Sequence, residues 1–541
     1  MNWTPIKKRM EEEKDMICKL KRKKILGIFS LALVLCLTAC GGSGDQAPAN
    51  GESKDKAGDL TVGVTSFADT LEPTEQYFSW VITRYGVGET LVKFNEEGEV
   101  IPGLAKSWSV SDDQKTWTFD LEEGVKFSNG KAMDGQAVKA SIERTFELSD
   151  RAKEFFDYEK IEADGNKLMI TTKEPVAMLP GSLADPLFLI VDASANTEEF
   201  ASKGPICTGP YKVESFSPAQ ETVVVANENY RGQVPLNKVT FRCIEDQATR
   251  SMALQSGEIQ VAYNLKTENL ADFQGHKNIE TQELDSLRTT MAFMNENGPL
   301  KDKALRQAFI RGLDRKTYTE SLLGGGASPG KTIIPPTLDF GFDEIKDENA
   351  YNPESAKEIL KQAGYVDKDG DGFVENKDGS KLELNFVIYT SREELGIYAQ
   401  AAQTSLKEIG LKVNLETVSY ETLLDRRDAG QYDLLIWNVL VANTGDPEKY
   451  LRENFYSSSK SNTMAYKNEK VDQDLDELVK TFDEEKRKDL VMEIQDEIMK
   501  DAGVAVFGYE KTLLFYDKSV QGLELFPMDY YWLTDQVSLE K

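Results

Sequence analysis

The chain has 541 residues, 40% of them hydrophobic and 9% aromatic, and its formal net charge at pH 7 is −28. This length is too great for one small domain and predicts at least two compact lobes. The acidic balance argues against nucleic acid and anionic lipid headgroups as partners, because both would be repelled.

An export signal is predicted at the start of the chain. The basic block Lys19–Lys24 precedes an apolar run, Ile25–Leu37, that is too short to cross a bilayer. The run ends in Leu37-Thr38-Ala39-Cys40, which resembles the lipobox of bacterial lipoproteins, whose cysteine is acylated and becomes the new N-terminus. A plain secretory signal is the alternative interpretation. We expect residues 1–40 to be a lipoprotein signal peptide with its lipobox, cleaved before Cys40, so that the lipidated Cys40 anchors the protein at the outer face of the cytoplasmic membrane.

A flexible tether is expected after the anchor. Residues 41–58 are rich in glycine, serine, alanine and charge, a composition typical of linkers. Residues 1–40 carry nine Lys/Arg and four Asp/Glu, so 55 basic and 88 acidic residues remain after cleavage and the net charge becomes −33. Such a charge favours solubility and says little about the ligand.

Short strands and helices are mixed in the first half of the folded part. Alternating apolar and polar residues predict strands, and a helical spacing follows Asp134. The predicted strands are Leu60–Phe67, Lys115–Leu121, Lys167–Pro175, Glu221–Tyr230 and Lys238–Asp246, and the predicted helix is Asp134–Ser149.

A strand–helix–strand pattern dominates the second half. Helical periods fill 302–326, and three strands separated by two helices follow. This alternation predicts a largely parallel sheet and, for the whole chain, an α/β fold. The predicted strands are Lys381–Ser391, Leu411–Tyr420 and Tyr432–Val441, and the predicted helices are Arg392–Gly410 and Glu421–Gly430.

The sequence carries almost no catalytic signal, and the one nucleophile-elbow pattern, Gly326–Gly330, does not follow a predicted strand. The single histidine, His276, argues against a His-rich zinc site and leaves a Ser–His–Asp triad dependent on one residue. Neither a P-loop nor a dinucleotide-binding glycine motif after a strand occurs. We therefore expect a protein that is not an enzyme and requires no cofactor.

One acidic loop has the spacing of a calcium site. Asp367, Asp369, Asp371 and Glu375 occupy positions 1, 3, 5 and 9 of an EF-hand-like loop, with Gly372 at the sharp turn. Position 12 holds an aspartate instead of the usual bidentate glutamate, and a predicted strand follows where a helix would be expected. A plain surface turn rich in Asp and Gly is the alternative.

Two cysteines, Cys207 and Cys243, remain after the signal and the anchor. Outside the cytoplasm they could form a disulfide. Two separate buried thiols are the alternative, because the sequence gives no distance between them.

Several ordered stretches together resemble one protein family. They are similar to the large substrate-binding proteins of ABC importers for peptides, opines and nickel, extracellular solute-binding protein family 5. The resemblance covers nearly all of residues 59–541. Its stretches are Ile101–Arg144, Gly204–Phe216, Asn227–Gly232, Lys303–Tyr318, Tyr351–Tyr365 and Ala442–Leu451.

The resemblance implies a two-lobed, hinged fold of the type II periplasmic-binding-protein kind. Lobe I would comprise residues 59–285 completed by 509–541, and lobe II residues 286–508. The ligand would be enclosed between the lobes by hinge closure. The protein would be a monomeric, lipid-anchored binding protein that delivers its solute to an ABC permease and its ATPase.

The resemblance leaves two ligand classes open. In peptide-binding members, an aspartate four residues before the proline of the ligand-lining segment pairs with the peptide amine. Here that position, counted from Pro447, is Asn443, which carries no charge. This stretch therefore favours a nickel chelate as the ligand. The chelator would supply most metal ligands, and nickel would be present only as cargo. A short peptide is the other ligand class.

Seven residues are candidates for the ligand cleft. An arginine would hold a carboxylate with two hydrogen bonds, and a tryptophan would cover an apolar face. Core tryptophans, surface arginines and a capping aspartate are the alternatives. The candidates are Trp80, Arg84, Arg288, Trp437, Asn443, Thr444 and Asp446.

Two other functional classes stay open on the sequence alone. A secreted hydrolase based on carboxylates is one, and a solute sensor or adhesin on the same fold is the other, because a fold does not fix a function.

Overall fold

The computed structural model describes residues 58–65, 68–389 and 392–540. The predicted signal, Cys40 and nearly all of the tether lie outside these residues. Residues 56–541 belong to one compact unit. Among the described residues, every helix is too short or too polar to cross a bilayer.

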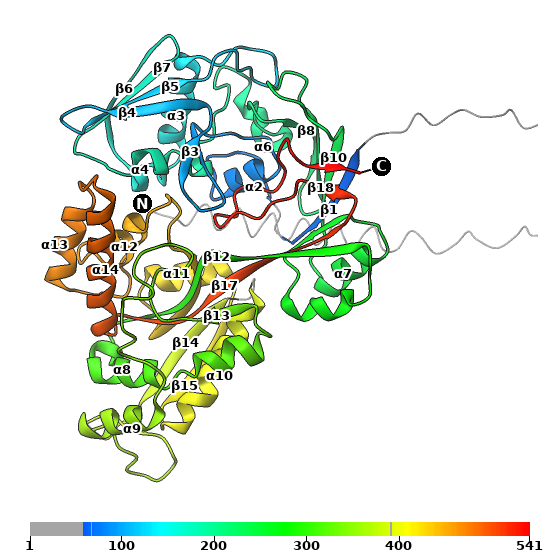
Figure 1. Ribbon diagram of the computed structural model, residues 1–541. Helices are drawn as coiled ribbons and strands as arrows, with labels where there is room; N and C mark the ends of the chain where they lie inside the picture. Colours follow the sequence, from blue (N-terminus) through cyan, green and yellow to red (C-terminus); the bar gives the residue numbers. More distant parts are fainter. Residues whose placement is uncertain (1–57, 66–67, 390–391, 541) are drawn as a thin grey trace, which may run out of the picture. The chain divides into compact units, whose positions relative to one another are not determined.

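An eleven-stranded sheet forms the centre of this unit (Figure 1). Its strands are β1 (Asp59–Val64), β8 (Tyr211–Ser217), β9 (Glu221–Ala226), β10 (Lys238–Cys243), β11 (Val261–Tyr263), β12 (Ile279–Met294), β13 (Ala327–Pro329), β14 (Glu383–Tyr389), β15 (Lys412–Val418), β16 (Leu434–Leu440) and β17 (Val504–Asp517). The order is β15-β14-β16-β12-β17-β11-β1-β10-β9-β8, and β13 pairs with β17 outside this path.

The strand–helix–strand segment follows the sequence prediction. β14 pairs in parallel with both β15 and β16. The helix α10 (Glu393–Glu408) packs on these strands, and Gly410, with a φ of +82°, follows its end. The helix α11 (Tyr420–Asp428) is capped by Ser419, whose hydroxyl accepts the N–H of Thr422. The predicted parallel arrangement is therefore confirmed.

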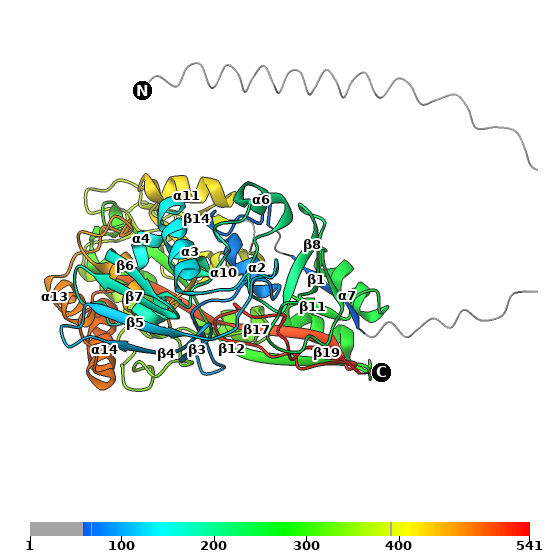
Figure 2. The ribbon, with the colours of Figure 1, turned by 90° about the horizontal axis from the view of Figure 1, so that it is seen from above.

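A second sheet of four antiparallel strands lies earlier in the chain. Its strands are β4 (Ala105–Val110), β5 (Thr116–Leu121), β6 (Tyr158–Asp164) and β7 (Lys167–Thr172), in the order β4-β5-β7-β6. The helix α3 (Gly135–Leu148) packs on β6 and β7, and Figure 2 shows it beside them. Asp134 caps α3 by accepting the N–H of Ala137, at the position where the sequence predicted a helix start.

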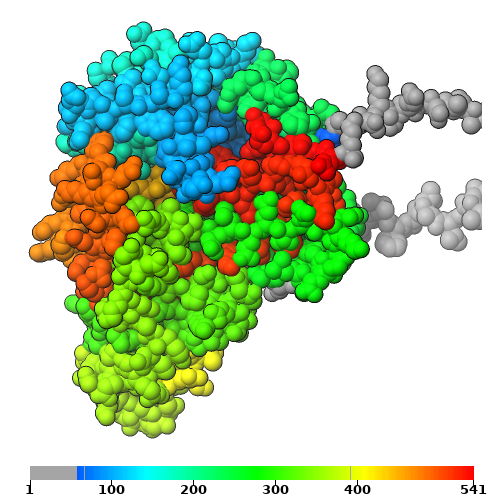
Figure 3. Space-filling model, viewed as in Figure 1, coloured from blue at the N-terminus to red at the C-terminus, as the bar shows by residue number. Residues whose placement is uncertain are grey.

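The C-terminal segment returns to the N-terminal part of the fold. Figure 3 shows this segment in red against the blue N-terminal residues. The N–H of Leu533 donates to the carbonyl of Arg84, and Val537 packs in one core with Leu60. Two small sheets complete the strands: β2 (Val92–Phe94) with β3 (Val100–Pro102), and β18 (Val520–Gln521) with β19 (Ser538–Leu539).

The remaining helices surround these sheets. They are α2 (Phe78–Arg84), α4 (Ala152–Phe155), α5 (Leu179–Ser182), α6 (Phe200–Lys203), α7 (Gln247–Gln255), α8 (Lys303–Arg311), α9 (Pro353–Gln362), α12 (Glu448–Phe455), α13 (Glu469–Leu478) and α14 (Glu484–Lys500). Short turns of 3-10 type are η1 (Pro186–Phe188), η2 (Thr197–Glu199), η3 (Thr267–Phe273) and η4 (Pro299–Lys301), and η5 (Thr317–Leu322) is a π-helical turn.

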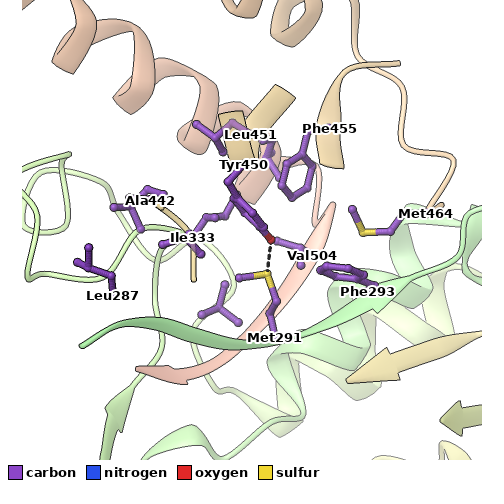
Figure 4. Close-up of a cluster of buried hydrophobic side chains, with 14 of the residues drawn as sticks. Leu287, Met291, Phe293, Ile333, Ala442, Tyr450, Leu451, Phe455, Met464 and Val504 are labelled. Carbon is purple, nitrogen blue, oxygen red and sulfur yellow. Dashed lines mark hydrogen bonds between the residues drawn. The ribbon is translucent and has the colours of Figure 1, made fainter. Parts of the chain in front are cut away.

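The largest apolar core among the described residues joins β12, β16 and β17 with neighbouring helices and also takes in residues of the four-stranded sheet and α3. Figure 4 shows part of it, where the hydroxyl of Tyr450 donates to the sulfur of Met291 at 3.0 Å. This contact gives a buried phenol a partner in apolar surroundings. Burial also raises the pKa of Tyr450 far above its usual range.

Two long strands connect the two regions that the sequence assigned to separate lobes. The predicted boundaries at 285/286 and 508/509 fall inside β12 and β17, which pair with each other in antiparallel fashion. Both strands continue through the predicted lobe boundaries, in keeping with the single compact unit that residues 56–541 form. The lobe limits themselves remain a prediction.

The disulfide between Cys207 and Cys243 is not formed. Both thiols are free, Cys207 is buried, and Cys243 at the end of β10 is partly exposed. The Cys243 sulfur instead lies 3.2 Å from a carboxylate oxygen of Glu245. The second alternative from the sequence, two separate thiols, describes the structure.

Candidate functional site

A cavity of about 540 Å³ lies where β12 and β17 run side by side. It is lined by both charged and aromatic side chains, which come from segments far apart in the chain. Tyr263 and Trp532 form one wall, with their rings stacked at 4.0 Å between centroids. The lining also includes Arg288 from β12, Glu510 from β17, and Arg392 and Glu394 at the start of α10.

A bulge in β12 brings Arg288 to this cavity. Asp285 pairs with Lys511 and Thr289 pairs with Tyr509, so three residues of β12 lie opposite one residue of β17. Ser286 fixes the bulge, because its hydroxyl donates to the Glu510 carbonyl at 2.7 Å and accepts the N–H of Arg288 at 3.1 Å. Bulges of this kind redirect side chains at functional sites.

Arg288 is the predicted ligand residue with the strongest structural support. Its guanidinium donates to the Asn438 side-chain oxygen at 3.3 Å, and among the described residues no carboxylate lies within ion-pair distance of it. Burial, together with the positive charge of Arg392, lowers the pKa of Arg288 to about 10. A cationic side chain at the edge of a cavity, with donors to spare, is suited to bind an anionic group.

Arg84 holds two residues that line the cavity, so its guanidinium is not free for a ligand. Its guanidinium forms an ion pair with Asp529 at 2.6 Å and donates to the Asp529 carbonyl at 2.8 Å. It also lies 4.7 Å from the centre of the Trp532 ring, and the Trp532 indole donates to Asp529 at 2.7 Å. Arg84 therefore positions Asp529 and Trp532, two cavity residues that the sequence reasoning missed.

Trp80 and Trp437 lie in separate aromatic groups. The Trp80 ring meets Tyr530 edge to face at 5.0 Å, and within the described part of the chain its buried indole N–H has no hydrogen-bond partner. Trp437 packs between Tyr389 and Tyr420, at 6.3 and 5.9 Å. The unused donor makes Trp80 the better candidate of the two for a polar ligand contact.

Asn443 contacts a buried carboxylate that sequence reasoning missed. Its side-chain amide donates to Asp185 at 3.4 Å, and the Tyr530 hydroxyl donates to the same Asp185 oxygen at 3.2 Å. The other Asp185 oxygen caps η1 by accepting the Leu187 N–H. Burial raises the pKa of Asp185. The only signal in the sequence was an Asp-Pro pair, which is common in turns.

Thr444 and Asp446 serve the local fold. Asp446 forms a buried ion pair with Arg487 at 2.8 Å and accepts the Glu448 N–H at the start of α12. The Thr444 hydroxyl donates to the Asp446 carbonyl at 3.0 Å. These contacts occupy the polar atoms and argue against a ligand role for either residue, in agreement with the capping alternative.

The acidic loop can bring four carboxylates together. One oxygen from each of Asp367, Asp369, Asp371 and Glu375 lies within 4.8 Å of the others. Asp367 accepts the N–H groups of Gly370 and Gly372, as a tight loop around a cation requires. The Lys381 ammonium lies 2.8 Å from Asp371 and would compete with a cation for that side chain. The four carboxylates suit calcium, whereas the Lys381 ammonium makes the loop a poorer calcium site.

His276 is exposed and does not line the cavity. A ligand bound beside Arg288 would therefore receive no imidazole from this chain.

The chain is similar to known binding proteins of bacteria. The profile of the bacterial extracellular solute-binding proteins, family 5 middle region, matches residues 99–462. The probable D,D-dipeptide-binding periplasmic protein DdpA of Escherichia coli (strain K12) is 28% identical over 490 residues, which are 87% of this chain and 92% of DdpA.

Two solved structures show the same arrangement of elements. The nickel ABC transporter protein of Bacillus halodurans is 30% identical, with a TM-score of 0.73 over 89% of this chain and all of that one. The oligopeptide-binding protein AppA of Bacillus subtilis, in complex with a nonapeptide, has a TM-score of 0.76 at 22% identity over 90% of this chain and 99% of AppA. The mixed α/β, two-lobed fold expected from the sequence is thereby confirmed. The chain belongs to the bacterial extracellular solute-binding proteins of family 5.

Proposed function

We propose that this protein is the extracytoplasmic substrate-binding component of an ABC importer, which captures a short peptide or a nickel chelate and delivers it to a permease and its ATPase. Family membership supports the binding role, since the relatives are binding proteins of transporters and not enzymes. The protein needs no cofactor for this task and acts as a monomer.

The observation that carries the proposal is Arg288. A guanidinium deep in the molecule, partly open to a cavity and without a carboxylate partner among the described residues, costs free energy unless a ligand neutralises it. Both proposed ligand classes offer such a group, because a peptide ends in a carboxylate and common nickel chelators carry carboxylates. The names of the relatives, one for a dipeptide and one for nickel, cover the same two classes.

Native mass spectrometry of the exported protein tests this proposal. The intact chain is measured as purified, then with nickel plus free histidine, and then with a pool of short peptides. We expect an adduct of one of these classes, and Arg288→Met to weaken it about tenfold or more, since loss of a buried charge contact costs roughly 2–5 kcal/mol. A protein that binds neither class contradicts the proposed function.

We also propose that Cys40 carries the lipid that keeps the binding protein near its permease. The lipobox-like residues before Cys40 support this, and tethering raises the effective concentration of loaded protein at the permease. Cys40→Ser should abolish incorporation of labelled palmitate and release the protein from the membrane fraction. Unchanged labelling would exclude Cys40 as the lipidated residue.

Calcium in the acidic loop would be structural. The loop lies between α9 and β14, and none of its four carboxylates lines the cavity. Nickel, in contrast, would be cargo inside a chelate.

A further inference from the structure

Glu510 is the cross-strand neighbour of the bulge that carries Arg288. The pairs Asp285–Lys511 and Thr289–Tyr509 leave Glu510 alone opposite residues 286–288. Opposite charges at neighbouring positions of paired strands usually attract each other. Both side chains also line the same cavity.

The two charges nevertheless do not pair with each other. Arg288 reaches across to Asn438 on β16, and Glu510 accepts a hydrogen bond from the Thr290 hydroxyl at 2.7 Å. Within the described ranges, neither side chain has an oppositely charged group within 4.0 Å. The Tyr398 hydroxyl is a second neutral neighbour of Glu510. Only neutral groups therefore hold the two side chains, and both keep hydrogen-bonding capacity for a ligand.

The other charged groups around the cavity are already satisfied or lie at its exposed edge. Arg250 is buried and donates to the carbonyls of Tyr263 and Asn264, and Glu245 is exposed. The ion pairs among the lining residues and their neighbours are Arg392–Glu394 at 3.3 Å, Lys511–Glu283 at 2.6 Å, Lys266–Glu393 at 2.5 Å and Asp529–Arg84 at 2.6 Å.

We propose that Glu510 is a second ligand-binding residue, which receives a positively charged ammonium group while Arg288 holds a carboxylate of the same ligand. The ligand class is then a zwitterion with a free amine, such as a short peptide. This inference rests on the proposed function and narrows it. Glu510 on β17 also supplies the negative charge that Asn443 does not provide.

The energetics of Glu510 favour this assignment. Burial and the negative charge of Glu394 raise the pKa of Glu510 to about 7 against the opposing effect of the Arg392 charge, so the ionised carboxylate is costly without a cation in direct contact. A ligand ammonium would offset that cost. An amine that coordinates nickel has given up its extra proton, so it cannot act as an ammonium. The geometry therefore ranks a free peptide above an amine-bound chelate.

Chemically blocked ligands test the role of each charge separately. The intact exported chain, its Glu510→Gln variant and its Arg288→Met variant are titrated with a pool of unmodified di- and tripeptides, and then with the same pool after N-acetylation or C-amidation. Binding is followed by native mass spectrometry and calorimetry. A matched control is Glu162→Gln, an exposed glutamate on β6 that pairs with Lys160 and does not line the cavity.

We expect Glu510→Gln to weaken unmodified peptides about tenfold or more, and to make no difference to N-acetylated peptides, which lack the ammonium. Arg288→Met should weaken unmodified peptides to a similar degree and make no difference to C-amidated peptides, which lack the terminal carboxylate. Glu162→Gln should bind as the unaltered chain does, and thermal melting checks that all variants fold.

Equal losses of Glu510→Gln for free and N-acetylated peptides would overturn the proposal, because they would indicate a structural role. Binding of nickel–histidine in preference to every peptide, with no effect of Glu510→Gln, would also overturn it and yet leave the importer function standing. Binding of neither class would reject both.

Discussion

The side-chain amide of Asn443 lies 3.4 Å from the buried carboxylate of Asp185, across 258 positions of sequence. Asp185 has no cation within ion-pair distance among the residues that the structure describes, so only neutral groups contact it. Buried carboxylates of this kind are costly when ionised. The contact therefore joins two distant segments at a buried carboxylate, whose charge Arg151 and Lys449 offset only from beyond ion-pair distance.

Asp185→Asn should stabilise the protein at pH 7 by roughly 1–3 kcal/mol, because a neutral amide costs less to bury than a carboxylate. The folded-state pKa of Asp185 is raised above its unfolded value, so the folded form binds more protons between the two pKa values. Stability from this group is thus present below the unfolded pKa of 3.8 and lost as pH rises through the folded pKa.

Urea unfolding at several pH values measures this difference. The advantage of Asp185→Asn should shrink as pH falls toward 3.8. Asp134→Asn is the matched control, since Asp134 also caps a helix but is exposed. An advantage that grows on acidification would contradict the assignment.

Gly181→Ala should hinder the close approach of α5 to the segment around Thr444. A Cβ at Gly181 would fall well inside contact distance of the Thr444 carbonyl oxygen. We expect the free energy of unfolding and the melting temperature to fall, because even a small misfit of packed backbones costs roughly 1–3 kcal/mol of stability. Gly396→Ala in α10 is the control, since no atom lies within 4 Å of its Cβ position and alanine favours a helix.

Thermal melting of the Gly181→Ala and Gly396→Ala variants tests this prediction, and calorimetric titration shows whether ligand affinity changes with it. A Gly181→Ala protein with unchanged affinity and melting temperature would show that the two segments can separate without consequence.

Asp446→Ala should destabilise the protein by about 3–5 kcal/mol, because it leaves the buried Arg487 guanidinium without its partner. Asp476→Ala removes an exposed partner of Arg452 and should cost less than about 1 kcal/mol. Urea denaturation gives both values. A large loss of ligand affinity in Asp446→Ala at full stability would restore the ligand role that its ion pair argues against.

Calcium should raise the melting temperature if the acidic loop binds it, because binding to the folded state alone adds RT ln(1 + [Ca]/Kd) to stability. Asp367→Asn should remove this effect, since Asp367 anchors the loop through Gly370 and Gly372. Asp378 lies outside the four-carboxylate group, so Asp378→Asn should still show the rise in melting temperature with calcium. Differential scanning calorimetry with calcium, with magnesium and with a chelator distinguishes the cases; no shift in any variant would mean a plain surface turn.

Local patterns made the fold of the second half predictable. The alternation in β14 to β16, the helical spacing of α10 and the glycine at 410 each act over a few residues, so they are visible in sequence. Contacts over long separations were not predictable. Arg84 was expected in the cleft, but its partner Asp529 lies 445 residues away.

The same limit explains why Glu510 was missed. Its place beside Arg288 depends on a bulge in β12 and on the register between β12 and β17, and neither has a pattern in the residues themselves. Arg288 was found because the resemblance pointed to the crossing between lobes. Asp185 had no comparable signal.

The two unpaired thiols, Cys207 and Cys243, have a consequence for the sulfur chemistry of the protein. Burial raises the pKa of Cys207, and burial with the nearby Glu245 raises the pKa of Cys243 to about 12. Only the thiolate attacks disulfides and most oxidants, so both sulfurs remain protonated and unreactive at neutral pH. Two copies of the chain would therefore resist cross-linking through the sulfurs of Cys207 and Cys243.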